Sequence, residues 1–214
     1  MLTETKDKNY IIKNFKVGPI ETNCYAVMDK ITKKIAIVDP GYYSQEILNW
    51  IYEEKAAVEM VILTHGHFDH ILGLDMFSDV LVYINEHDEE MLTDPEKNAG
   101  FMINQKDFKK PKNLKTISDG SLINFSKSQF KTIHTPGHTK GSCCFIFNEE
   151  YLFSGDTIFK GSIGRSDLYG ADPNQIKNSV RKILNLDKNY IILPGHGNTS
   201  TIMFEKNNNP YSLT

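Results

Sequence analysis

Four apolar runs in this sequence each end at a polar residue whose side chain can bind a metal ion. Short runs of this kind, rich in Val, Ile, Phe and Tyr, predict buried strands. In layered α/β folds, binding sites gather at the carboxyl ends of strands, so four such ends would bring their polar residues to one edge. The four runs and the residues that follow them are VEMVILT (58–64) before His65, FKTIHT (130–135) before Pro-Gly-His138, YLFSG (151–155) before Asp156, and YIILPG (190–195) before His196.

The remaining sequence adds further strands and two helices, which predicts a mixed α/β fold. Ile47, Leu48 and Ile51 form a helical stripe within residues 44–55, and Ser44 is placed to cap that helix. Asp172-Pro173 combines a capping residue with a proline at the first helical position, and predicts a helix to about residue 186. Strands are also predicted at residues 10–17, 24–28 and 34–39 and in a hairpin of 143–148 with 151–155 around Asn148–Glu150, while 85–113 is predicted to be short helices and loop.

Length and composition favour one globular domain over residues 1–214, with residues 1–9 frayed. The net charge of −3 gives no support to a nucleic-acid partner. No apolar run approaches the ~18 residues of a membrane helix, and the N-terminus lacks the apolar core of a secretory signal. An odd number of cysteines, two of them adjacent, predicts buried reduced thiols and a cytoplasmic protein; these are Cys24, Cys143 and Cys144.

The stretch THGHFDH (64–70) places four candidate ligands within six positions. In an α-helix, residues two apart face nearly opposite directions, so His65 and His67 could not share a face. In an extended segment, His65, His67 and Asp69 lie on one side and His70 on the other. We therefore predict a loop at the end of a strand, wrapped so that His65 and His67 serve one metal while Asp69 and His70 serve another.

Each of these two half-sites needs one more ligand, because a zinc centre takes about three protein ligands plus an open position. His138 is the candidate for the first metal and His196 for the second, and Asp156 can bridge both because a carboxylate has two oxygens. The mixture of imidazole and carboxylate suits zinc and tolerates iron or manganese. Asp39, at the end of a strand before Pro40-Gly41, is expected to have a structural role near the site.

These residues resemble the metallo-β-lactamase superfamily. THGHFDH, TPGHT, GDTIF and PGHG occur in that family's order, and the resemblance spans roughly residues 15–200. It implies a four-layer αββα sandwich with the metals at one edge between two sheets. It also implies that His65, His67 and His138 bind one metal, that Asp69, His70 and His196 bind the other, and that Asp156 bridges them.

Within the superfamily, the chain is similar to glyoxalase II-like hydrolases through GDTIFKGSIGRSDLYG (155–170), NCY (23–25) and PGHG. That resemblance implies hydrolysis of a small-molecule thioester, an S-2-hydroxyacyl thiol, by a hydroxide bridging two metals. It gives Asp69 the role of orienting the nucleophile or moving its proton. Arg165 matches a basic position that contacts the thiol cofactor, and can pair with a carboxylate; its alternative is a structural ion pair with Asp167.

The sequence departs from glyoxalase II at the substrate side. The chain ends 18 residues after His196, where those enzymes continue into a helical domain, and Asp167 and Asn198 stand where the family has tyrosines that hold glutathione. The thiol moiety therefore stays open, with Arg165, Asp167 and Asn198 as the candidate substrate-binding residues.

The main alternative is a persulfide dioxygenase with a single iron on His138, Asp156 and either His65 or His67. The well-placed His196 favours the hydrolase. A β-lactamase, a lactonase or a nuclease of the same superfamily is disfavoured, the first by the missing export signal and the last by the net charge. A flavodiiron-type protein would have Glu in place of His67, and an inactive binding module would lack ligands that this chain retains.

Overall fold

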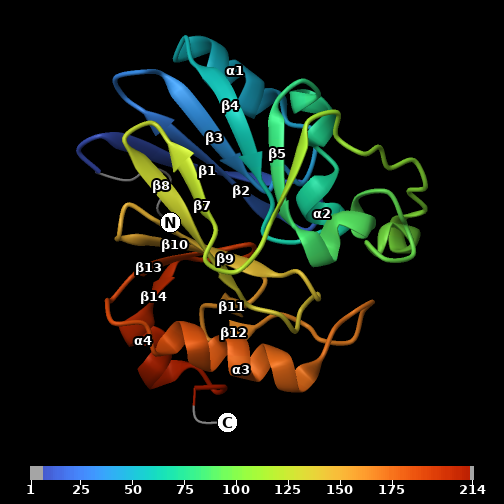
Figure 1. Cartoon of the computed structure of the whole chain (residues 1–214), viewed down its shortest axis with the longest axis vertical. Coiled ribbons are helices and arrows are strands. Elements are labelled where there is room, and N and C mark those ends of the chain that lie inside the picture. The colour runs from blue at the N-terminus through green and yellow to red at the C-terminus, as the bar shows by residue number, and fades with distance from the viewer. Residues whose placement is uncertain (1–6, 213–214) are drawn as a thin grey trace.

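Two six-stranded sheets face each other, with helices on their outer surfaces, in the computed structural model of the chain, which describes residues 7–212 (Figure 1). The first sheet has the strand order β1 (Tyr10–Val17), β2 (Thr22–Asp29), β3 (Lys34–Val38), β4 (Ala57–Ile62), β5 (Leu81–Asn85), β6 (Leu114–Ile117). The second has the order β14 (Ser200–Thr201), β13 (Ile191–Pro194), β10 (Tyr151–Gly155), β9 (Cys143–Phe147), β8 (Ser128–His134), β7 (Leu122–Phe125). A small hairpin is formed by β11 (Ile158–Phe159) and β12 (Ser162–Ile163).

The helices divide between the two outer faces. Over residues 7–212, the α-helices are α1 (Gln45–Glu53), α2 (Phe68–Ile71), α3 (Pro173–Leu184) and α4 (Ile202–Asn208). In Figure 1, α1 lies beside the first sheet, whereas α3 and α4 lie beneath the second. Three 3₁₀ turns lie in the connections between strands of the first sheet. They are η1 (Leu74–Phe77) between β4 and β5, and η2 (Glu86–Leu92) and η3 (Gly100–Ile103) between β5 and β6.

Three separate apolar clusters hold these layers together. The central cluster lies between the sheets and is rich in phenylalanine, with Phe125, Phe145 and Phe147 all at 0% exposure. A second cluster joins the other face of the first sheet to Trp50 of α1, and a third joins the second sheet to Val180 of α3. Because each fully buried Phe stabilises the fold by about 1.5–3 kcal/mol, the central cluster makes a large apolar contribution to stability. The clusters establish the predicted αββα sandwich.

Most predicted elements form where the sequence places them. Ser44 accepts the N–H of Ile47 and caps α1, and Asp172 accepts the N–H groups of Asn174 and Gln175 and caps α3. The elements that were not predicted from the sequence are β5, β6, β7, β11, β12, β14, α2, α4 and the 3₁₀ turn η1. Residues 1–9 were expected to fray, and residues 1–6 of that segment lie outside the described part of the chain. Within the described part, Asp7 Oδ1 accepts the N–H groups of Asn9 and Tyr10.

The strand directions bring the four predicted strand ends together. Strands β8, β10 and β13 run the same way in the second sheet, because β9 is antiparallel to both β8 and β10 while β13 is parallel to β10. The end of β4 in the first sheet reaches the same place, where the N–H of Cys143 donates to the carbonyl of Thr64 at 2.8 Å. The site is therefore shared between two sheets. Among the described residues, no helix is long and apolar enough to cross a membrane.

Candidate metal centre

The HGHFDH stretch changes conformation halfway along. After β4, the N–H and hydroxyl of Thr64 both donate to Asp39, at 2.8 and 2.7 Å, and no helix begins before His67, whose own backbone is extended. Phe68–Ile71 then forms the single helical turn α2, where a loop throughout was expected from the sequence. The turn begins where the N–H of Phe68 donates to the carbonyl of Asn98 at 2.9 Å. Asp69 and His70 thus lie on a short helix, about 100° apart.

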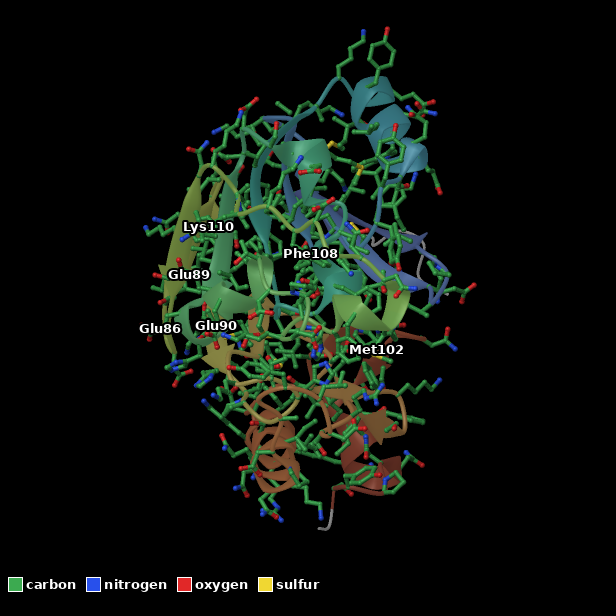
Figure 2. The ribbon with its side chains drawn as sticks, turned by 90° about the vertical axis from the view of Figure 1, so that its right-hand side faces the viewer. Glu86, Glu89, Glu90, Met102, Phe108 and Lys110 are labelled. Carbon is green, nitrogen blue, oxygen red and sulfur yellow. The ribbon has the colours of Figure 1, made fainter. Side chains whose placement is uncertain are left out.

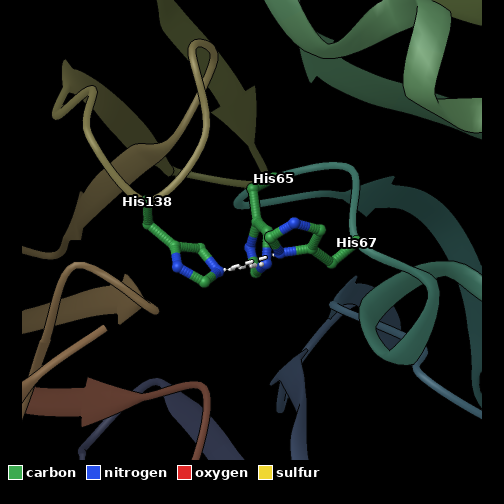
Figure 3. A group of neighbouring side chains, drawn as sticks. All are labelled: His65, His67 and His138. Carbon is green, nitrogen blue, oxygen red and sulfur yellow. Dashed lines mark hydrogen bonds between the residues drawn. The ribbon is translucent and has the colours of Figure 1, made fainter. Parts of the chain in front are cut away.

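Three histidines form the first group of potential ligands. His65, His67 and His138 are 1–3% exposed and have ligand nitrogens within 4.8 Å of one another (Figure 3). The Nε2 atom of His138 lies 2.9 Å from Nδ1 of His67 and 3.2 Å from Nε2 of His65. His138 Nδ1 donates to the carbonyl of Arg165 at 2.8 Å, so its Nε2 carries a lone pair that faces the other two rings.

The second group contains Asp69, His70 and His196, which come from α2 and from the end of β13. Asp69 Oδ2 lies 3.2 Å from His70 Nε2 and 3.1 Å from His196 Nε2. Asp156 stands between the two groups, with Oδ1 3.5 Å from His70, and Oδ2 3.5 Å from His138 and 3.6 Å from His196. The structure therefore gathers all the residues that the sequence nominated as metal ligands.

This arrangement fits divalent cations better than it fits hydrogen bonding alone. His70 Nδ1 is occupied by Asp39 Oδ2 at 2.9 Å, which leaves a lone pair on Nε2 directed at the carboxylates of Asp69 and Asp156. Both His70 Nε2 and Asp156 Oδ1 are buried without a hydrogen-bond partner, as is His67 Nε2. Buried polar atoms rarely stay unpaired. A cation bound between His70 Nε2 and Asp156 Oδ1, which face each other, would give both atoms a partner.

The pKa values follow the same division into two groups. Burial, followed by the repulsion of neighbouring rings, holds the pKa values of His65 and His67 well below the ordinary value, so both are neutral. Burial alone would lower the pKa of His70, but Asp69, Asp156 and Asp39 raise it well above that value. Burial would likewise raise the pKa of Asp69, but His70 and His196 keep it well below. The raised pKa keeps His70 protonated while no cation is bound, so a metal at Nε2 would displace that proton. His65 and His67, as neutral imidazoles, and Asp69, as an ionised carboxylate, are already in the forms that bind metals.

A surrounding set of polar residues fixes these side chains. Thr22 donates its hydroxyl to Asp69 at 3.1 Å. The Asn23 side chain donates to the carbonyls of Pro194 and Gly197, and the Tyr25 hydroxyl donates to Pro194, so β2 holds the turn that carries His196. The roles of Thr22 and Asn23 were not predicted from the sequence. Two polar residues opening an otherwise apolar strand were the available signal, because buried polar groups need partners.

The three candidate substrate-binding residues are at the surface rather than within the cluster. The Nε and Nη2 atoms of Arg165 donate to the two carboxylate oxygens of Asp167 at 2.7 and 2.9 Å, which is the structural ion pair considered from the sequence. The side chains are 50% and 65% exposed. Asn198 is exposed two residues after His196. Only the backbone carbonyl of Arg165 takes part in a described hydrogen bond with a ligand residue, His138.

Comparison with known proteins assigns the chain to a family. A sequence model of the metallo-beta-lactamase superfamily matches residues 17–196. An uncharacterised protein from Mycobacterium leprae is 36% identical, over 94% of this chain and 98% of its own length. The probable metallo-hydrolase YqgX of Bacillus subtilis is 32% identical over 93% and 96%, and the hydroxyacylglutathione hydrolase GloC of Haemophilus influenzae is 31% identical over 92% and 97%.

Solved structures agree with this assignment. BLEG-1, described as a B3 metallo-beta-lactamase, superposes with a TM-score of 0.86 and 33% identity, over 95% of this chain and all of that one. TTHA1623, solved in a di-iron-bound form, superposes with a TM-score of 0.80 and 28% identity, over 92% and 98%. The family match over residues 17–196, the αββα layers and the histidine and aspartate cluster at the sheet edge together show that this chain belongs to the metallo-β-lactamase superfamily of metallo-hydrolases.

Proposed function

We propose that the protein hydrolyses a small-molecule thioester, of the S-2-hydroxyacyl thiol class, at a dinuclear metal centre. The observation that carries the proposal is the complete set of seven buried or partly buried side chains, arranged as two groups with Asp156 between them. The 31% identity to the hydroxyacylglutathione hydrolase GloC supports the substrate class. The reaction adds water to the thioester carbonyl and breaks the C–S bond, which gives a carboxylic acid and a free thiol.

The residues of the candidate centre have separate roles in this proposal. His65, His67 and His138 would hold one ion, Asp69, His70 and His196 the other, and Asp156 both. The ions are most simply zinc, with iron or manganese as alternatives, and when bound they lower the pKa of water and polarise the carbonyl. Asp69 is the candidate to orient the water and move its proton, because its carboxylate lies close to both His70 and His196. Since a thiolate leaves readily, no strong general acid is needed.

Arg165 is the proposed anchor for a carboxylate on the substrate, with Asp167 and Asn198 beside it. Asp167 engages Nε and Nη2 of the guanidinium, so a substrate carboxylate would approach Nη1. The pairing with Asp167 differs from the glutathione-binding tyrosines of glyoxalase II, which favours a thiol other than glutathione. A cytoplasmic location and the absence of a nucleic-acid or membrane partner stay predictions.

Metal analysis combined with parallel assays tests the proposal. We expect two metal ions per chain in the purified protein, and release of thiol from hydroxyacyl thioesters that stops when the metals are removed. A chain with one iron that consumes oxygen with a persulfide, and cleaves no thioester, would instead be a persulfide dioxygenase.

The second candidate reaction is β-lactam hydrolysis, because BLEG-1, at 33% identity, is described as a B3 metallo-beta-lactamase. The two hydrolyses share the attack of water on a carbonyl and differ in the bond that breaks, C–S or C–N. Opening of a β-lactam ring with a kcat/KM above that for every thioester tested would replace the thioester by a β-lactam as the substrate.

A further inference from the structure

Asp88 is a buried carboxylate that the proposed reaction does not use. It lies in the 3₁₀ turn η2, whose other carboxylates, Glu86, Glu89 and Glu90, lie toward the surface (Figure 2). The Asp88 side chain points inward instead, and the residue is 0% exposed. Burying an ionisable group in this way is costly unless its oxygens are well paired, so the partners of Asp88 show what the burial achieves.

Those partners belong to the two loops that carry the three-histidine group. Asp88 Oδ2 accepts the N–H of Gly66 at 3.1 Å and the hydroxyl of Thr139 at 2.6 Å. Its Oδ1 accepts the N–H of Gly141 at 2.7 Å. Gly66 lies between His65 and His67, and Thr139 directly follows His138. One carboxylate therefore joins the loop after β4 in the first sheet to the loop after β8 in the second.

The two glycines leave the room that this contact needs. A Cβ on Gly141 would lie 2.6 Å from Cγ of Asp88, and a Cβ on Gly66 would lie 2.6 Å from Cβ of Met91 in the same turn. Neither glycine has a positive φ, so close approach rather than backbone conformation explains the residue type. Both loops therefore contribute to the space that Asp88 and its turn occupy.

The second group of ligands has different supports. His70 is held by Asp39, Asp69 by Thr22, and the turn carrying His196 by Asn23. We propose that Asp88 is a positioning residue for the three-histidine half of the centre, and that it sets the metal affinity of that half without setting the affinity of the other. This inference rests on the proposed two-metal centre. Outer-shell partners of metal ligands are commonly worth 10–100-fold in affinity.

Asp88→Asn is the direct test. The amide has the same shape but one acceptor oxygen, so its nitrogen must face either Gly141 N–H or Gly66 N–H, both of which are donors. The variant is combined with His196→Ala, in which the remaining zinc occupies the three-histidine group, and with His67→Ala, in which it occupies the other. We expect Asp88→Asn to weaken zinc binding about 10–100-fold in the first background and less than about two-fold in the second. Zinc affinities are measured by competition with a chromophoric chelator.

Thr139→Val separates positioning from charge, and it decides the question if Asp88→Asn does not fold. It keeps the Asp88 carboxylate and removes one of its hydrogen bonds, so we expect a smaller loss confined to the same background. The matched control is Glu205→Gln, since Glu205 is also 0% exposed and accepts the N–H of Gly161 in the β11–β12 turn. It should leave both zinc affinities unchanged.

Three results would overturn the inference or its basis. Equal losses in the two backgrounds would mean that Asp88 acts through its charge on the whole centre, and no loss in the His196→Ala background would remove its positioning role. A wild-type chain that binds no metal would instead overturn the proposed two-metal centre, and so the two failures are distinguishable.

Discussion

At the residue scale, single histidines decide how many metals the centre can hold. His196 reaches the second group from the end of β13 and is the least buried of its candidate ligands, with a side chain 26% exposed. His196→Ala leaves that position with Asp69, His70 and Asp156, two of them negatively charged and without the closing imidazole. We expect the zinc content to fall from two ions per chain to one, because the three-histidine group stays intact. Elemental analysis after dialysis measures the ratio, and a content of two would show that His196 is not a ligand.

The exposed Arg165 makes a different kind of prediction, because its ion pair with Asp167 contributes little to stability. Exposed pairs of this type are typically worth about 0.2–1 kcal/mol. Arg165→Ala should therefore leave the unfolding midpoint almost unchanged. If Arg165 anchors a substrate carboxylate, the variant should raise KM about ten-fold for a carboxylate-bearing thioester, as expected for a lost charged contact of ~1.4 kcal/mol, with kcat preserved.

An acyl thioester without a carboxylate is the control for Arg165→Ala. Its KM should not change, because its binding never used the guanidinium. Equal increases in KM for the charged and the uncharged substrate would show that Arg165 shapes the entrance and does not recognise a charge.

At the element scale, the loop after β8 is pressed against the start of α3. Gly137 has φ of +132°, and a Cβ there would lie 2.1 Å from the backbone nitrogen of Ile176. The Gly137 carbonyl also accepts the N–H of Asp172, the cap of α3. Gly137→Ala must therefore displace either the helix or the adjacent His138. We expect a loss of about 3 kcal/mol or more in unfolding free energy, from backbone strain together with the clash.

Gly120→Ala is the matched control for that variant, since Gly120 has φ of +75° and a Cβ there would meet no atom within 4 Å. Only the left-handed backbone conformation is penalised at this position, at about 1–2 kcal/mol. Urea unfolding of both metal-free variants compares the two costs. Similar losses would mean that the contact between Gly137 and α3 relaxes easily.

Elements with a local signal were predictable from sequence, and those defined by distant contacts were not. The strand ends before His65, Asp156 and His196 were visible because apolar runs stop abruptly at polar residues. The helical turn α2 was missed, because its first N–H is satisfied by Asn98, some 30 residues away in sequence, and four residues carry no periodicity. Asp88 was missed for a related reason: it sits in an acidic stretch with three surface carboxylates, and only tertiary structure distinguishes it.

At the scale of the whole molecule, the candidate metal centre lies across the boundary between the two sheets. His65, His67, Asp69 and His70 follow β4 of the first sheet, whereas the other three candidate ligands follow strands of the second. The inter-sheet aromatic cluster holds these halves together independently of the centre. Metals should therefore stabilise a sandwich that already folds, and a metal-free chain should keep its secondary structure.

Binding to the folded chain alone sets the size of that stabilisation. A ligand at 100 times its dissociation constant contributes about 2.7 kcal/mol, and for a chain of this length each kcal/mol raises the melting temperature by roughly 2–4 °C. We expect Tm to fall by roughly 5–11 °C for each ion removed by a chelator, and to recover when zinc is added back. In His196→Ala, with one ion expected, the chelator should produce about half the wild-type shift. A wild-type Tm that does not respond to the chelator would mean that the cluster joins the two sheets without metal, through the contacts of its own side chains.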